Sequence, residues 1–76
     1  MYIQIIGLDR FDFLDLCNDL GEGWYKSVEE IDDLEEVNVS IDTEVVTLKI
    51  NDKIWLHKGD KIAEIEADHF QKIEIL

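Results

Sequence analysis

A surplus of carboxylates sets the strongest limit on how this chain can fold. The 76 residues carry 19 acidic and 7 basic side chains, which gives a formal net charge of −12 at pH 7. Such a charge opposes compaction, but 46% of the residues are apolar, and disordered chains lack that share. We therefore expect one small acidic domain over residues 1–76, because this length suits a single domain.

The same charge excludes a class of function. Phosphates repel a chain this negative, so we do not expect direct binding to DNA or RNA. Cys17 is the only cysteine, so no disulfide can form within the chain, and this fits a cytoplasmic protein. We see no signal peptide and no apolar run near the roughly 20 residues of a membrane span, so we expect no membrane partner.

The first 21 residues predict a strand followed by an amphipathic helix. Residues 2–6 are short, apolar and rich in isoleucine, which is typical of a strand. Gly7 and Asp9 then indicate a turn and a helix cap, and Gly21 a left-handed stop after a helix over 10–20. At 100° per residue its acidic side chains share one stripe, and its apolar side chains form one broad arc. The stripe is Asp12, Asp15 and Asp19, and the arc is Phe11, Phe13, Leu14, Leu16, Cys17 and Leu20.

A second helix is predicted over residues 28–35. Ser27 and Glu30 have the spacing of a capping box. Val28, Ile31 and Leu34 then recur every three residues, with six carboxylates between positions 29 and 36. These carboxylates are the densest charge in the chain, and residues 1–38 hold 11 acids and two bases, a net charge of −9.

From residue 37 the apolar period changes to two, which indicates strands. We expect strands over 37–42, 45–50, 53–57, 61–66 and 72–76, with turns at Asn51-Asp52 and at 58–60. The predicted fold is α+β: an N-terminal strand, two short helices, then an antiparallel meander of about four strands. The helices are expected to pack on one face of the sheet.

The two predicted helices together present an acidic face, which consists of Asp12, Asp15 and Asp19 and of the six carboxylates between residues 29 and 36. This face has three possible interpretations. It can be a solvated surface that keeps the protein soluble, or it can reflect the general acidity of a halophile. The chain has 11 isoleucines and six lysines against one arginine, a bias typical of AT-rich genomes, which argues against a halophile. The face can also imitate a nucleic-acid backbone, because carboxylates on a helix face approach the charge density of one DNA strand. Crowding like charges opposes folding, and a basic nucleic-acid channel would be the complementary partner.

In charge and length the chain resembles the small acidic inhibitors that phages use against restriction and CRISPR effectors. The resemblance rests on no sequence motif. It implies a class of partner, a basic protein that binds nucleic acid, and a DNA-mimic mode of inhibition.

Aromatic residues form a second candidate surface. Trp24 and Tyr25 follow a flexible Gly-Glu-Gly joint, and Trp55 lies on the opposite strand face from Ile54 and Leu56. Core packing is the ordinary role of such residues, but Trp and Tyr are also enriched in binding hot spots. They could therefore anchor a protein partner beside the acidic face.

Catalytic and metal chemistry find little support. His57 and His69 could join Asp60, Asp68 or Cys17 at a metal, but no spacing fits a zinc or EF-hand pattern. Cys17 lies on the apolar arc and is interpreted as a buried hydrophobe. No nucleophile, base and orienting group occur together, so we expect a protein that is not an enzyme and has no cofactor and no metal.

Residues 59–69 resemble the hairpin of lipoyl domains, which has the pattern G-D-x-x-A-E-I-E-x-D-K. His69 stands where those domains carry the modified lysine, and only seven residues follow it. We attribute this likeness to strand-turn-strand composition.

The sequence therefore predicts a small acidic inhibitor that binds the basic nucleic-acid-binding surface of another protein, such as a phage-encoded anti-CRISPR or anti-restriction protein. The alternatives are an immunity or antitoxin-like partner of a basic nuclease, or a regulatory module that binds through Trp24, Tyr25 and a sheet edge. A homodimer through a strand edge is also possible. The expected partner-binding residues are Asp12, Asp15, Asp19, Glu29, Glu30, Asp32, Asp33, Glu35, Glu36, Trp24 and Tyr25.

Overall fold

The fold is α+β, with one α-helix among the residues described by the computed structural model. These are residues 2–21, 23–31, 33, 35–42, 45–49 and 53–75, of which 45–49 are described by their backbone alone. Asp32, Leu34 and the predicted Asn51-Asp52 turn lie outside them. The elements in chain order are β1 (Tyr2–Asp9), α1 (Arg10–Leu20), β2 (Tyr25–Ile31), β3 (Glu36–Asp42), β4 (Val45–Lys49), β5 (Lys53–Lys58), β6 (Lys61–Glu66), the 3₁₀ turn η2 (Ala67–His69) and β7 (Lys72–Ile75).

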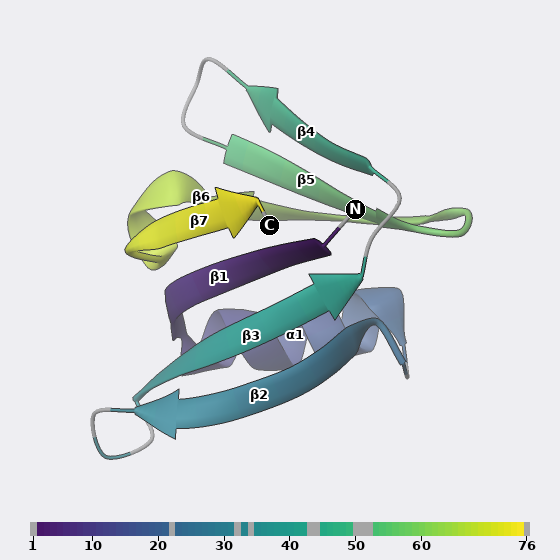
Figure 1. Cartoon of the computed structure of the whole chain (residues 1–76). Coiled ribbons are helices and arrows are strands. Elements are labelled where there is room, and N and C mark those ends of the chain that lie inside the picture. Colours follow the sequence, from purple (N-terminus) through teal and green to yellow (C-terminus); the bar gives the residue numbers. More distant parts are fainter. Residues whose placement is uncertain are drawn as a thin grey trace.

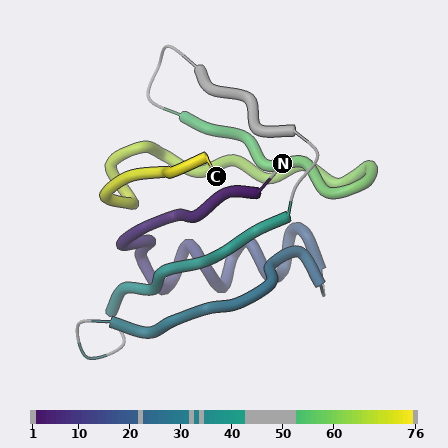
Figure 2. Tube along the Cα trace, viewed as in Figure 1, coloured from purple at the N-terminus to yellow at the C-terminus, as the bar shows by residue number. Residues whose placement is uncertain are grey.

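The strands form two sheets and not the single meander expected from the sequence. Four strands pair in the order β2-β3-β1-β7, and a second sheet, with the order β4-β5-β6, is built on the β5–β6 hairpin. Figure 1 shows β1 inside the first sheet and β7 at its margin. Because β7 returns to β1 antiparallel, the start of β1 and the end of β7 lie side by side (Figure 2).

One apolar core joins the two sheets and α1. Alternate residues of β1 and β3 are buried on one face, and those of β5 and β6 meet them from the second sheet. The period-two pattern predicted for residues 37–42 agrees with this, since Val37, Val39 and Ile41 are buried. The buried core comprises Ile3, Ile5, Leu8, Leu16, Leu20, Trp24, Val37, Val39, Ile41, Ile54, Leu56, Ala63 and Ile65.

Both predicted ends of α1 are confirmed. The Asp9 carboxylate accepts hydrogen bonds from the backbone N–H groups of Phe11 and Asp12, at 2.8 and 3.3 Å, as an N-cap does. Gly21 ends the helix with a φ of 78°, and its N–H donates to the carbonyl of Cys17. Left-handed φ of this kind favours glycine.

The apolar arc of α1 is only partly buried. Leu16 and Leu20 are in the core, and Phe13 and Cys17 pack against it. Phe11 and Leu14 are 76% and 46% exposed, which corrects the prediction that they lie on the core side. The buried face of the helix is narrower than the apolar arc because α1 contacts the core along one line of side chains.

The predicted second helix over 28–35 is wrong. Residues 25–31 form β2, which pairs antiparallel with β3 and sets Val28 beside Val39. A strand carries Glu29 and Glu30 on opposite faces, whereas a helix would have gathered the six carboxylates on its exposed side. Pairing with β3 therefore provides hydrogen bonds and separates like charges.

Gly7 lies within β1 and not in a turn, as the sequence had suggested. The register of β1 against β3 shifts between Ile5 and Leu8, which marks a β-bulge, and Gly7 adopts a φ of 68° there. The bulge lets β1 continue to Asp9, directly before α1. No described helix has the length and apolar character needed to cross a membrane.

Candidate functional site

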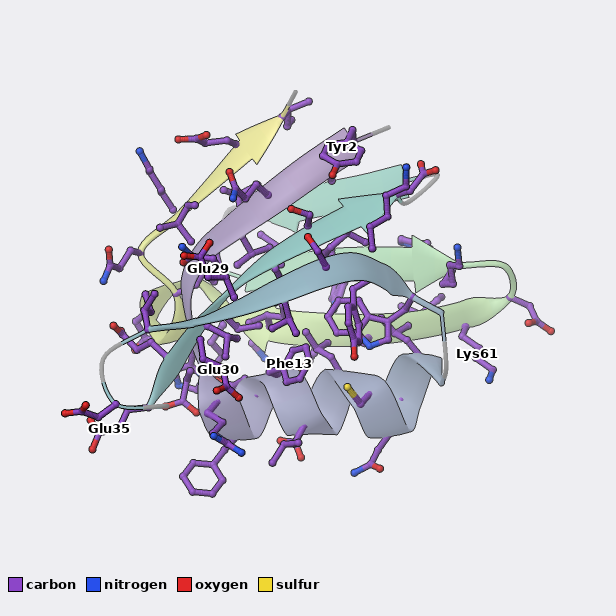
Figure 3. All side chains as sticks on the ribbon, turned by 60° about the horizontal axis from the view of Figure 1, so that its bottom comes forward. Tyr2, Phe13, Glu29, Glu30, Glu35 and Lys61 are labelled. Carbon is purple, nitrogen blue, oxygen red and sulfur yellow. The ribbon has the colours of Figure 1, made fainter. Side chains whose placement is uncertain are left out.

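Carboxylates from four parts of the chain converge at one end of the molecule. We call this surface the acidic end. It lies where β1 passes into α1, beside the β2–β3 connection and η2. Figure 3 shows Glu30 and Glu35 on this side and Lys61 on the opposite side. The acidic end comprises Asp9, Asp12, Glu30, Glu35, Glu36, Glu66 and Asp68.

Strand pairing and backbone hydrogen bonds bring these residues together. Asp9 and Glu36 are directly opposite in the β1–β3 ladder, so their Cα atoms are about 4.5–5.5 Å apart. The N–H of Arg10 donates to the carbonyl of Glu35 at 3.0 Å, which holds the β2–β3 connection against the start of α1. On the other side, the N–H of Gln71 donates to the carbonyl of Ile6 at 2.8 Å and ties the segment after η2 to β1.

His69 is surrounded by carboxylates. Its Nδ1 lies 2.7 Å from Asp12 Oδ2, and its Nε2 lies 3.7 Å from Asp68 Oδ1 and 3.9 Å from Glu66 Oε2. Burial raises the pKa of Asp12 above its ordinary value, against the opposing effect of the charge and hydrogen bond of His69. The contact with His69 thus holds Asp12 in place and orders this part of the surface.

A small open cleft of about 180 Å³ lies within the acidic end. Gly7 forms part of its wall, and its N–H donates to Asn38 Oδ1 at 3.0 Å. Carboxylates on the lining can accept hydrogen bonds from guanidinium or ammonium groups. The lining residues are Gly7, Asp9, Glu36, Asp68, His69, Phe70 and Gln71.

Arg10 is a cation that contacts this surface. Arg10 Nη1 lies 3.9 Å from Glu30 Oε1, which is a long contact between half-exposed groups and is weak in water. Lysines pair on other elements, as Lys53 with Glu64 and Lys72 with Glu74. Asp33 and Glu35 are exposed and form no ion pair with a described residue.

The other predicted acidic residues divide between separate surfaces. Asp15 and Asp19 are exposed on α1, whereas Asp12, from the same stripe, is half-buried against His69. Glu29 points away from the face of the sheet that carries Glu30 (Figure 3). The single carboxylate field on two helices, predicted from the sequence, is therefore replaced by an end surface on strands, turns and one helix terminus.

The aromatic residues that the sequence singled out serve mainly to pack the structure. Trp24 is 1% exposed, and its Nε1 donates to Cys17 Sγ at 3.5 Å. Its ring centroid lies 5.1 Å from that of Tyr25 and 5.8 Å from that of Phe13. Tyr25 lies at a second cavity of about 390 Å³, beside Cys17, Gly21 and Gly23.

Trp55 is half-buried on β5, directly opposite Glu64 of β6. Its Nε1 donates to Glu64 Oε2 at 2.8 Å. This hydrogen bond, followed by the charge of Lys53, holds the pKa of Glu64 below its ordinary value. Trp55 therefore stabilises the β5–β6 hairpin.

Sequence reasoning did not assign Asp9, Glu66, Asp68 or His69 to this surface. Asp9 was interpreted as a helix cap, and the other three lie more than 50 residues after Asp9 in the chain. Only the return of β7 to β1 brings η2 beside α1, and no local pattern encodes that pairing.

Ligand-type atoms of Glu66, Asp68 and His69 lie within 4.8 Å of one another. They are the described residues that could hold a divalent cation. All three are exposed, and solvated side chains of one short segment do not by themselves make a metal site.

Comparisons of the chain with protein-family models, with curated proteins and with solved structures gave no match.

Proposed function

We propose that this protein is a non-enzymatic inhibitor that occupies the basic nucleic-acid-binding surface of another protein, in the manner of a DNA mimic. The convergence of seven carboxylates at the acidic end supports this proposal. They come from separate elements, so the fold concentrates charge beyond what the sequence alone requires.

Electrostatics favours a cationic partner. Self-repulsion among clustered carboxylates destabilises the compact state, and a partner rich in Arg and Lys relieves it on binding. Complementary fields also accelerate encounter, with a rate that falls as salt rises. A groove built for phosphates offers fork-shaped guanidinium groups that bind carboxylates equally well.

An immunity or antitoxin-like partner of a basic nuclease would use the same surface, so it remains the second candidate. The third candidate is a regulatory module that docks through Trp24, Tyr25 and a sheet edge. Its aromatic part has less support because Trp24 is almost fully buried and Tyr25 is half-buried. A phage origin, a cytoplasmic location and an anti-CRISPR or anti-restriction role belong to the proposal as well.

The test is inhibition of DNA cleavage by a panel of CRISPR and restriction nucleases, with and without the protein. We expect inhibition of a susceptible nuclease that added competitor DNA weakens. Glu35→Lys and Asp68→Lys should each reduce affinity by about tenfold, since rim charges contribute of this order. Asp60→Lys in the β5–β6 turn changes the charge equally and should have little effect.

Two results would contradict the proposal. Inhibition that persists unchanged in Glu35→Lys/Asp68→Lys would show that the acidic end is not the contact surface. Retardation of DNA by the isolated protein at physiological salt would show that the electrostatic argument fails, because a chain of this charge should be repelled.

A further inference from the structure

The outer edge of β7 carries a self-complementary pattern of charged and apolar side chains. Among the described residues β7 pairs only with β1, so its other backbone edge has no strand beside it (Figure 3). Such an edge is a template for pairing with another chain. The sequence of the strand is Lys72-Ile73-Glu74-Ile75.

The two faces of β7 differ in character. Ile73 and Ile75 are paired with Ile5 and Ile3, which are fully buried, so they lie on the core side of the sheet. Lys72 and Glu74 are paired with Ile6 and Gln4 on the opposite, open face. Their side chains are 62% and 41% exposed, and Lys72 Nζ lies 2.9 Å from Glu74 Oε1.

We propose that two copies of this chain associate by antiparallel pairing of β7 with β7 around a two-fold axis at Ile73. In this register Lys72 faces Glu74 of the second copy, and Glu74 faces Lys72 of the second copy. Ile73 faces Ile73 of the second copy. Ile75, which is 62% exposed, lies diagonally opposite Ile73 of the second copy. The four-stranded sheet then continues across the axis into the second molecule.

Side-chain alternation selects this register, and the balance of charge favours this edge. A slip by one residue would turn the apolar side chains of one copy toward the charged face of the other. The other edge strand of the sheet, β2, carries Lys26, Glu29 and Glu30 and is therefore net negative. The β7 edge is balanced, and opposite charges across paired strands are favourable.

Sedimentation velocity across a concentration series tests this inference independently of the proposed function. We expect the mass of the wild-type protein to rise from 8.9 kDa toward twice that value. Lys72→Glu and Glu74→Lys should each weaken association by about tenfold, because each places like charges opposite each other twice. Lys72→Glu/Glu74→Lys restores the opposite pairs and should associate within about twofold of the wild type.

Glu74→Lys separates this pairing from general repulsion. The variant is less negative than the wild type, so nonspecific repulsion alone would predict tighter association, whereas the pairing predicts weaker association. Lys61→Glu on β6, with the same charge change as Lys72→Glu, is the control and should weaken association less. Circular dichroism verifies that each variant is folded. A protein that stays monomeric at about 1 mM, about 10³-fold above micromolar affinities, or a double swap that fails to restore association, overturns the inference.

Discussion

Single residues at the acidic end combine structural and electrostatic roles. Asp9 caps α1, pairs with Glu36 across the ladder and lines the cleft. His69 is close to three carboxylates at once. At this scale the sequence indicates a role only where the interaction is local, as a cap is.

Removing the cap should separate its two roles. Asp9→Ala deletes the acceptor of two N–H groups and should destabilise the protein by about 1 kcal/mol. Asp9→Asn keeps an acceptor and removes the charge, so its stability should stay close to that of the wild type. Urea unfolding of the two variants measures the difference, and equal losses would show that the charge rather than the cap matters.

Removing His69 should raise the pKa of Asp12 further. Burial already raises this pKa, and the charge and hydrogen bond of His69 lower it, so His69→Gln removes most of the opposing effect. The carboxyl carbon shift of Asp12, followed by NMR across pH, measures the change. His57→Gln is the control, because His57 is not among the groups that shift Asp12.

The sign of the linkage follows from the direction of the shift. A carboxyl whose pKa is raised on folding contributes stability below its ordinary value of 3.8, and this contribution is lost as pH rises through the raised folded pKa. In His69→Gln that loss should be larger. A free energy of unfolding between pH 4 and 6 identical to that of the wild type would contradict the role assigned to His69.

At the scale of elements, α1 shows how burial departs from an apolar pattern. Phe11 and Phe13 lie two residues apart, yet Phe11 is 76% exposed and Phe13 packs on Trp24 and Tyr25, with centroids at 5.8 and 5.3 Å. Figure 3 shows Phe13 between β2 and α1. The helical period predicts the helix but not how wide its buried face is.

The two phenylalanines therefore form a matched pair for mutation. Phe13→Ala should destabilise the protein by about 2 kcal/mol, since it removes a half-buried ring and its aromatic contacts. Phe11→Ala should change stability by less than about 0.5 kcal/mol. Chemical denaturation measures both, and a larger loss in Phe11→Ala would show that α1 is rotated relative to the arrangement described.

Elements with strong local signals were predictable, and those decided by pairing were not. Strands 37–42, 53–57 and 61–66 and helix 10–20 follow from periodicity with caps and turns, and the structure confirms them within a residue. Residues 27–35 have a capping box and an apolar residue at every third position, which fit a helix. The same segment can instead pair with β3, which sets Val28 beside Val39 and provides backbone hydrogen bonds between the strands. Nonlocal hydrogen bonds overrode the local preference there.

At the scale of the whole molecule, charge is distributed more unevenly than the sequence suggests. The sequence places most of the negative charge in residues 1–38, which predicted that one side of the molecule is more acidic. That prediction did not include Glu66 and Asp68, which come from the second half of the chain and join the acidic end at η2. The candidate surface is thus a product of topology, and the acidic helix stripe contributes only Asp12 to it.

Clustered charge should make folding stability depend on salt. With a net charge of −12, screening between about 0.01 and 0.2 M salt shortens the Debye length from about 30 to under 10 Å. We expect the free energy of unfolding to rise over this range, because repulsion among the carboxylates weakens. Thermal or urea unfolding at fixed pH measures it.

Where the charge lies decides how large this effect is. Neutralising Glu35→Gln/Glu66→Gln/Asp68→Asn at the acidic end should stabilise the protein at low salt by roughly 1 kcal/mol, from several like-charge contacts of a few tenths each. It should also flatten the salt dependence. Asp19→Asn/Glu29→Gln/Asp60→Asn removes the same charge from dispersed, exposed positions and should do less of both, because those carboxylates lie on α1, on β2 and in the β5–β6 turn. Equal effects of the two triple variants would mean that net charge alone, and not its concentration at one end, governs stability. The acidic end would then have lost the physical property that suits it to a cationic partner.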